Sequence, residues 1–170
     1  MKHILLTGKP RTGKTTLIKR IIEDLNSCGG FYTDEIIKNN QRRGFRIRTL
    51  EGKEGILASR DLKSKFKLGK YRINIKDLDE IGVKAIEEAL ETKDIIVIDE
   101  IGKMELFSDK FKAAVEKTLD SGKSLIGVIH IADIEFLNKI RGRKDVIVLE
   151  TNLENHARIF QKVKTLLKSG

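Results

Sequence analysis

A short glycine-containing stretch near the amino terminus constrains the fold more than any other part of the chain. Residues 8–15 read Gly-Lys-Pro-Arg-Thr-Gly-Lys-Thr, which fits the pattern of a glycine, any four residues and then Gly-Lys-Thr. The apolar run at 3–7 predicts a short buried strand before it, and the apolar spacing at 16–25 predicts an amphipathic helix after it. This order of strand, loop and helix predicts a phosphate-binding loop.

The residue types in this loop have physical reasons for their places. Two glycines let the backbone curl, so that successive N–H groups point at one phosphate. The loop leads into a helix amino terminus, whose unpaired N–H groups and dipole attract anions. We expect Lys14 to bring positive charge to the β- and γ-phosphates and the Thr15 hydroxyl to hold Mg²⁺. The candidate nucleotide-binding residues of the loop are Gly8, Lys9, Pro10, Arg11, Thr12, Gly13, Lys14 and Thr15.

A second motif ends a continuous apolar run in the middle of the chain. Residues 94–99 read Asp-Ile-Ile-Val-Ile-Asp, which is typical of a buried parallel strand that ends in an acid. After a phosphate loop, a Walker B acid is expected at such a position, so Asp99 is the second candidate Mg²⁺ ligand. Glu100 follows directly and is the candidate catalytic residue that polarises a water for in-line attack on the γ-phosphorus. The alternative is an acidic cap of a buried strand.

The nucleotide preference predicted from the motifs is a relaxed one. The run Asp-Glu-Ile-Gly at 99–102 also fits the Asp-x-x-Gly of GTP switches. The guanine-reading Asn-Lys-x-Asp is absent, however, because residues 138–141 read Asn-Lys-Ile-Arg and lack the acid. Selective binding of guanine is therefore not expected.

Several other polar residues have two interpretations each. Lys103 and Glu105 either touch a phosphate or a water, or form a salt-bridged surface turn. Residues 33–35 lie in an expected strand, where a switch-like segment would approach the γ-phosphate. Arg141 and Arg143 either stabilise transition-state charge on the γ-phosphate or belong to a solvated loop.

The rest of the chain predicts an α/β fold. Helical patterns separate three buried-strand patterns, which lie at 94–99, 124–129 and 146–149. Strands that alternate with helices imply a mostly parallel sheet with helices on both faces. Residues 31–58 depart from this order and predict an antiparallel edge or flap. Without repeats or a linker, residues 1–170 are expected to form a single domain.

Three further expectations concern the less regular parts. Gly29 and Gly30 are expected to end the first helical unit. The basic, weakly patterned segment 59–70 is expected to be a mobile surface loop. Thr151 and Glu154 fit a capping box that would open the last helix.

The composition bears on the setting and on partners. The 34 Lys and Arg residues against 25 Asp and Glu residues give a net charge of +9, which is compatible with nucleic-acid binding. The opposite charges are interleaved and aromatic residues make up only 5%, so a thermophile's charged surface is favoured over a nucleic-acid footprint. A single cysteine and the lack of an apolar run long enough to span a bilayer predict a cytoplasmic protein, which we expect to be a monomer.

Several of these segments together resemble the thermostable nucleoside-triphosphatase family, whose animal members are called cancer-related nucleoside-triphosphatase. They are the phosphate loop, Gly-Phe-Tyr-Thr at 30–33, residues 44–50 and Asp-Glu-Ile-Gly-Lys-Met-Glu-Leu at 99–106. The resemblance covers nearly the whole chain. It implies a RecA-like or kinase-like core and slow, Mg²⁺-dependent hydrolysis of ATP, GTP, CTP and UTP to the diphosphate and phosphate. It also implies that the nucleotide site includes a second segment, Ile95, Ile96, Val97, Ile98, Asp99, Glu100, Ile101 and Gly102.

Two other functions remain open from the residues alone. A small-molecule or nucleotide kinase uses the same phosphate loop, but needs an acceptor pocket and a lid that excludes water. A nucleic-acid-binding ATPase switch would account for the positive charge and would bind in a strongly salt-dependent manner.

Overall fold

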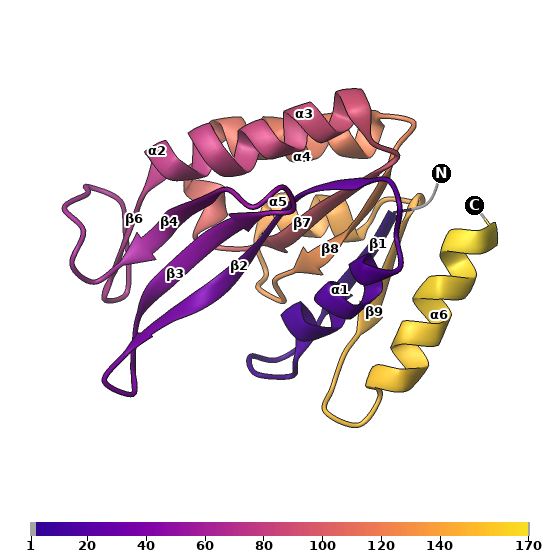
Figure 1. The fold of residues 1–170 in the computed structure, drawn as a ribbon, viewed down its shortest axis with the longest axis horizontal. Coiled ribbons are helices and arrows are strands. Elements are labelled where there is room, and N and C mark those ends of the chain that lie inside the picture. Colours follow the sequence, from indigo (N-terminus) through magenta and orange to yellow (C-terminus); the bar gives the residue numbers. More distant parts are fainter. Residues whose placement is uncertain (1–2, 170) are drawn as a thin grey trace.

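One nine-stranded sheet runs through the computed structural model, which describes residues 3–169 (Figure 1). The strand order is β5-β6-β4-β3-β2-β7-β8-β1-β9. The strands are β1 (His3–Thr7), β2 (Cys28–Lys38), β3 (Gln41–Thr49), β4 (Glu54–Ser59), β5 (Lys67–Leu68), β6 (Tyr71–Ile73), β7 (Ile95–Ile101), β8 (Ser124–Ile129) and β9 (Val146–Glu150).

Helices alternate with the strands of the parallel half as the sequence predicts, whereas β2 to β6 follow one another without a helix between them. The helices are α1 (Lys14–Glu23), α2 (Ile75–Asp77), the π-helical η1 (Leu78–Val83), α3 (Lys84–Thr92), the 3₁₀-helical η2 (Glu105–Phe107), α4 (Asp109–Asp120), α5 (Glu135–Arg141) and α6 (His156–Ser169). Between residues 3 and 169, no helix has the length and apolar character that crossing a bilayer requires.

The sheet has a parallel half and an antiparallel half that share β2. Strands β2, β7, β8, β1 and β9 are parallel to one another, whereas β2, β3, β4, β6 and β5 are joined by antiparallel pairings. The predicted α/β fold with an antiparallel segment is therefore confirmed, but this segment is larger than an edge. In Figure 1 the hairpin of β2 and β3 extends well beyond the helical layers.

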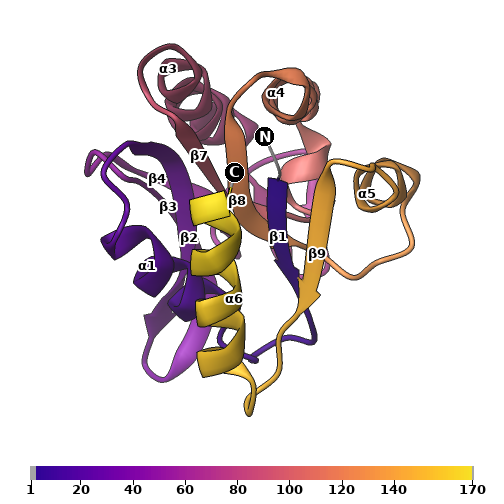
Figure 2. The same ribbon diagram turned by 90° about the vertical axis from the view of Figure 1, so that its right-hand side faces the viewer.

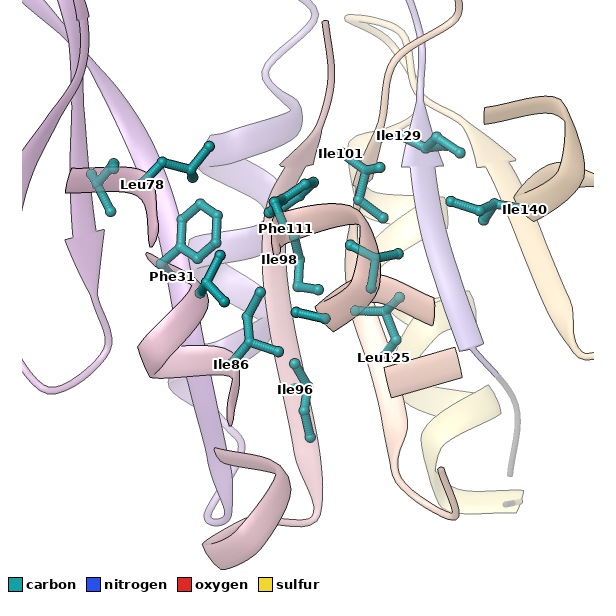
Figure 3. Packing of buried hydrophobic residues seen from close by; sticks show 14 of the residues in the cluster. Phe31, Leu78, Ile86, Ile96, Ile98, Ile101, Phe111, Leu125, Ile129 and Ile140 are labelled. Atoms are coloured by element: carbon teal, nitrogen blue, oxygen red, sulfur yellow. The ribbon is translucent and has the colours of Figure 1, made fainter. Parts of the chain in front are cut away.

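Helices cover both faces of the parallel half, because apolar side chains of its strands alternate between the faces. Ile96 and Ile98 of β7 pack under α3 and α4, whereas Val97 between them packs with α1 and α6. Figure 2 shows α1 and α6 on one face and α3, α4 and α5 on the other. In the larger core, the rings of Phe31 and Phe111 meet edge to face at 6.3 Å between centroids (Figure 3).

The expectation that Gly29 and Gly30 end the first helical unit was wrong. Both glycines lie inside β2, which pairs with β7 from Cys28 onward. Gly30 has a φ of +124°, and an added Cβ would lie 2.0 Å from the carbonyl oxygen of Val97. Gly30 therefore allows β2 to lie directly against the strand that carries the acid pair, whereas an added Cβ at Gly29 would lie 2.8 Å from the Cβ of Ala89 in α3.

Other boundaries also differ from the expectations. The segment expected to be a loop at 59–70 contains β5, which pairs with β6. The capping box was wrong as well, because α6 begins only at His156 and the Thr151 hydroxyl finds no hydrogen-bond partner among the residues that the structure describes. Asn152 and Asn155 instead organise this turn, as the backbone N–H of Asn152 donates to the side chain of Asn155 at 2.9 Å.

Candidate active site

A cavity of about 390 Å³ opens at the carboxyl ends of β1 and β7. One wall is the phosphate loop with the start of α1, and the floor carries Asp99 and Glu100. The opposite wall comes from the antiparallel half of the sheet. In such α/β sheets, ligands bind at the carboxyl ends of the strands. The predicted catalytic and metal-binding residues Lys14, Thr15, Asp99 and Glu100 all line this cavity.

The phosphate loop is held in a curled form by its own backbone and by α6. Arg11 and Gly13 have φ angles of 62° and 78°, so the chain turns through left-handed conformations before α1 begins. The Nζ atom of Lys14 donates hydrogen bonds to the carbonyl oxygens of Gly8 and Lys9, at 3.0 and 2.7 Å. These contacts keep the ammonium group across the mouth of the loop.

His156 braces the loop from outside. Its Nε2 lies 2.6 Å from the carbonyl oxygen of Thr12. Its ring occupies the space next to Gly13, where an added Cβ would lie 2.5 Å from the ring. The requirement for glycine at position 13 thus has a second cause besides the positive φ angle, and the sequence motif alone does not reveal it.

Asp99 is a buried carboxylate without enough compensating charge. Its side chain is 2% exposed, and burial raises its pKa to about 7, with the neighbouring Glu100 adding to the shift. The Thr15 hydroxyl and the Lys14 ammonium act in the opposite direction. Within residues 3–169, the Oδ2 atom has no hydrogen-bond partner. An unpartnered buried carboxylate oxygen beside a hydroxyl fits a divalent cation with oxygen ligands.

Glu100 is the next acid on the floor of the cavity. Burial raises the pKa of Glu100, and the Lys14 ammonium opposes this rise. The carboxylate lies over Gly102, where an added Cβ would come within 2.4 Å of Oε1. The glycine two residues later therefore makes room for the Glu100 side chain, which gives this position a role in the site.

Lys103 and Glu105 lie in the cavity, so a salt-bridged surface turn does not describe this pair. Glu105 is 2% exposed, and its burial together with the nearby charge of Glu100 raises its pKa well above the usual value. Lys103 makes no ion pair within the described part of the chain, and its charge helps to lower the pKa of His130 behind the effect of burial. His130 also lines the cavity.

Only part of each predicted segment faces the cavity. Of the second segment, Asp99 and Glu100 line it, while the apolar positions Ile95, Ile96, Val97, Ile98 and Ile101 pack into the two cores. These five side chains lie inside the sheet because side chains of a parallel strand point to its covered faces, and the assignment of the whole segment to nucleotide binding stays a prediction. In the first segment, Gly8, Lys9 and Thr12 shape the loop without lining the cavity.

The two candidate arginines do not line the cavity. Arg143 pairs with Asp120 and Asp145, at 3.0 and 2.9 Å, and its guanidinium also donates to the carbonyl oxygen of Leu119. Arg141 donates to the carbonyl oxygens of His130 and Ala132, both at 2.6 Å. Through these contacts, both side chains hold loops together.

The antiparallel strands contribute residues that sequence reasoning mostly missed. Thr33, Asp34 and Glu35 of β2 do line the cavity, as the interpretation of a switch-like segment required. Beyond them the wall contains Arg42, Phe45, Leu57, Leu68 and Met104. The four strand residues face the site only through the pairing of β2 with β3, of β3 with β4, of β4 with β6 and of β5 with β6. Met104 instead follows β7, within the segment 99–106.

Comparisons with known proteins agree with this geometry. The sequence model of a family described as NTPase matches residues 3–164. The chain is 48% identical to nucleoside-triphosphatase THEP1 of Thermotoga maritima over 165 residues, which is 97% of this chain and 95% of that protein.

Two solved structures have the same fold. The crystal structure of THEP1 from the hyperthermophile Aquifex aeolicus matches with a TM-score of 0.88 and 38% identity, over 98% of this chain and 99% of that one. The solution structure of a human cancer-related nucleoside triphosphatase matches with a TM-score of 0.85 and 33% identity, over 100% of this chain and 99% of that one.

Proposed function

The chain belongs to the NTPase family, and we propose that it hydrolyses the β–γ bond of ATP, GTP, CTP and UTP with the help of Mg²⁺. The products are the nucleoside diphosphate and phosphate. The observation that carries the proposal is that Lys14 and Thr15 share one cavity with Asp99 and Glu100, although the two pairs lie far apart in the sequence.

The metal-binding part of the proposal assigns Thr15 and Asp99 to Mg²⁺. The unpartnered Oδ2 of Asp99 and the adjacent hydroxyl supply the hard oxygen ligands that this ion prefers. When bound there, the ion neutralises negative charge on the β- and γ-phosphates. The raised pKa of Asp99 supports the same assignment, because the nearby lysine charge does not offset the burial of its carboxylate.

The chain's own residues account for the remaining steps. The backbone N–H groups of the phosphate loop and the ammonium of Lys14 bind the phosphates and neutralise charge that develops on the leaving β-phosphate oxygen. Glu100 accepts a hydrogen bond from the attacking water and aligns it with the γ-phosphorus. The water oxygen bonds to phosphorus as the bond to the β–γ bridging oxygen breaks.

Replacing Glu100 with glutamine tests this role. Glu100→Gln keeps the size of the side chain and removes the charge that orients the water, so we expect turnover to fall by about 100-fold or more. Nucleotide binding, measured with a fluorescent triphosphate analogue, should change little. Glu116→Gln on the exposed face of α4 is the matched control and should behave as the unchanged protein does. Unchanged phosphate release by Glu100→Gln would remove Glu100 from the mechanism.

A further inference from the structure

The cavity at the phosphate loop continues into a second hollow on the far side of Glu100. This hollow has a volume of about 530 Å³ and adds Gly69, Lys70 and Tyr71 to the lining. Its other lining residues, Arg42, Phe45, Leu68, Lys103 and Met104, line the first cavity too. The two spaces are therefore parts of one continuous cleft.

With the triphosphate placed as in the proposed function, the second hollow would lie beyond the terminal phosphate, because it shares Lys103 and Met104 with the first cavity but none of the phosphate-loop residues. The triphosphate lies between the loop amides and Lys14, with its terminal phosphate toward Asp99 and Glu100 in the proposed function. In an in-line displacement, the nucleophile enters opposite the bond that breaks. The space beyond Glu100, toward Lys103 and Met104, is thus the nucleophile's space.

The size of this space exceeds what hydrolysis requires. A water molecule occupies about 30 Å³ in the liquid. The second hollow is a shallow depression of about 530 Å³ that is widely open to solvent, so it leaves room for a ligand larger than water at the end of the first cavity. A water can react in this cleft, but the cleft is large enough for a second substrate.

The residues that line the hollow indicate which chemical groups a second substrate would carry. The rings of Phe45 and Tyr71 meet edge to face at 5.4 Å, and the Arg42 guanidinium lies 5.1 Å from the centroid of the Phe45 ring. The guanidinium also lies 5.6 Å from the centroid of the Tyr71 ring, so a flat ring in the hollow would meet the guanidinium plane together with Met104 and Leu68. Positive charge from Arg42, Lys70 and Lys103 surrounds this part of the hollow. Among residues 3–169, Arg42 pairs with Glu35 at 3.6 Å, and its Nε donates to the Tyr71 hydroxyl at 2.9 Å.

We propose that this hollow binds a nucleoside monophosphate, which accepts the γ-phosphoryl group of the bound triphosphate. The base lies against the wall of Phe45, Leu68 and Met104, and the phosphate is held by Lys103 and Arg42. An oxygen of the monophosphate bonds to the γ-phosphorus as the bond to the β–γ bridging oxygen breaks. Two diphosphates result, and the acceptor dianion gives up no proton. This inference rests on the placement of the triphosphate in the proposed function.

The experiment follows both products in one reaction of the full-length protein. γ-Labelled ATP and Mg²⁺ are incubated alone or with AMP, GMP, CMP or UMP, and labelled phosphate and labelled diphosphate are separated and counted. We expect at least one monophosphate to yield labelled diphosphate and to raise ADP formation by about tenfold, since a bound acceptor is held at high effective concentration. If all four monophosphates give labelled phosphate alone, at an unchanged rate, the inference is overturned while hydrolysis stands.

A substitution at Lys103 tests whether the monophosphate binds in the second hollow. Lys103→Ala should raise the KM for the active monophosphate about tenfold or more, because a charge-assisted hydrogen bond to its phosphate is lost. Lys117→Ala, on the exposed face of α4, is the matched control and should leave that KM unchanged. Equal KM values for the two variants would place the acceptor elsewhere. Transfer without any phosphate release in the absence of acceptor would instead contradict the proposed hydrolysis and leave the acceptor site standing.

Discussion

At the scale of single residues, Gly102 leaves the space that the proposed catalytic side chain of Glu100 occupies. The end of the Glu100 side chain fills the space that a Cβ on Gly102 would need, because its Oε1 lies 2.4 Å from the place of that Cβ. Because the group that must move is the far end of a flexible side chain, an added methyl group displaces the carboxylate and leaves the backbone in place. The effect of such a change should therefore fall on catalysis.

The corresponding prediction concerns Gly102→Ala. We expect kcat to fall by about tenfold or more, since the carboxylate no longer aligns the water. The KM for the triphosphate and the thermal unfolding midpoint should stay close to those of the unchanged protein. Steady-state kinetics and calorimetry measure these quantities. Gly122→Ala is the matched control, because an added Cβ there meets no atom within 4 Å. A stable Gly102→Ala protein with undiminished kcat would argue against the position assigned to the Glu100 carboxylate.

His3 is a second residue for which the structure allows a test, because its hydrogen bonds require a neutral ring. The ring is buried, its Nε2 lies 2.9 Å from the carbonyl oxygen of Leu119, and its Nδ1 accepts a hydrogen bond from the N–H of Leu125 at 3.0 Å. One nitrogen must donate and the other accept, so the neutral ring fits and a second proton does not. Burial accordingly lowers the pKa of His3 below its ordinary value of 6.5.

This lowered pKa predicts how stability depends on pH. The unfolded chain binds a proton on His3 below about pH 6.5, while the folded protein resists it, so the contribution of His3 to stability is present at neutral pH and is lost as the pH falls. The free energy of unfolding in urea, measured for the unchanged protein and for His3→Gln, should therefore differ less at pH 5 than at pH 7.5. A difference that is the same at both pH values would show that His3 is not held neutral.

At the scale of elements, the antiparallel half of the sheet is tied to the phosphate-loop helix by one acid. Asp34 of β2 pairs with Lys19 of α1 at 2.8 Å and with Arg48 of β3 at 2.6 Å. Arg48 also pairs with Glu54 of β4 at 2.5 Å, which makes this a network across four elements. Networks of this kind contribute more than isolated surface pairs, especially at high temperature.

Because of this network, we expect replacement of Asp34 to lower the free energy of unfolding by an amount that depends on salt concentration. Asp34→Asn should lower the free energy of unfolding by about 1 kcal/mol at low ionic strength, and by less at high salt, because partly exposed pairs are screened. Glu135→Gln, which breaks the exposed pair with Lys139 on α5, should cost about 0.5 kcal/mol or less. Urea titrations at two salt concentrations test both values. A loss for Asp34→Asn that does not exceed the loss for Glu135→Gln would contradict the role of the network.

The parts of the fold that were predictable are those with local causes. The phosphate loop and the strand before Asp99 are predicted by spacing and by apolar runs, since their chemistry is contained in a few neighbouring residues. The start of β2 at Cys28 was not predictable, because two glycines normally end an element, whereas here Gly30 allows close contact with β7 and Gly29 allows close contact with α3. The wall residues Phe45 and Leu68 were missed for a similar reason, as strand pairing alone brings them to the site.

At the scale of the whole molecule, each half of the sheet supplies a different part of the candidate site. The parallel half carries the phosphate loop at the end of β1 and the acid pair at the end of β7, with β8 between these strands. The antiparallel half begins at β2, next to β7, and builds the wall opposite the loop. The site therefore lies where the two halves of the sheet meet, and neither half contains all of its residues.

The most direct measurement is a crystal structure of the protein with Mg²⁺ and a triphosphate whose β–γ bridge is an imido group. We expect the phosphates to lie in the loop, Mg²⁺ to be bound at Thr15 and Asp99, and a water between Glu100 and the γ-phosphorus to be aligned for attack. A nucleotide bound in the loop with its terminal phosphate directed away from Asp99 and Glu100 would contradict this expectation.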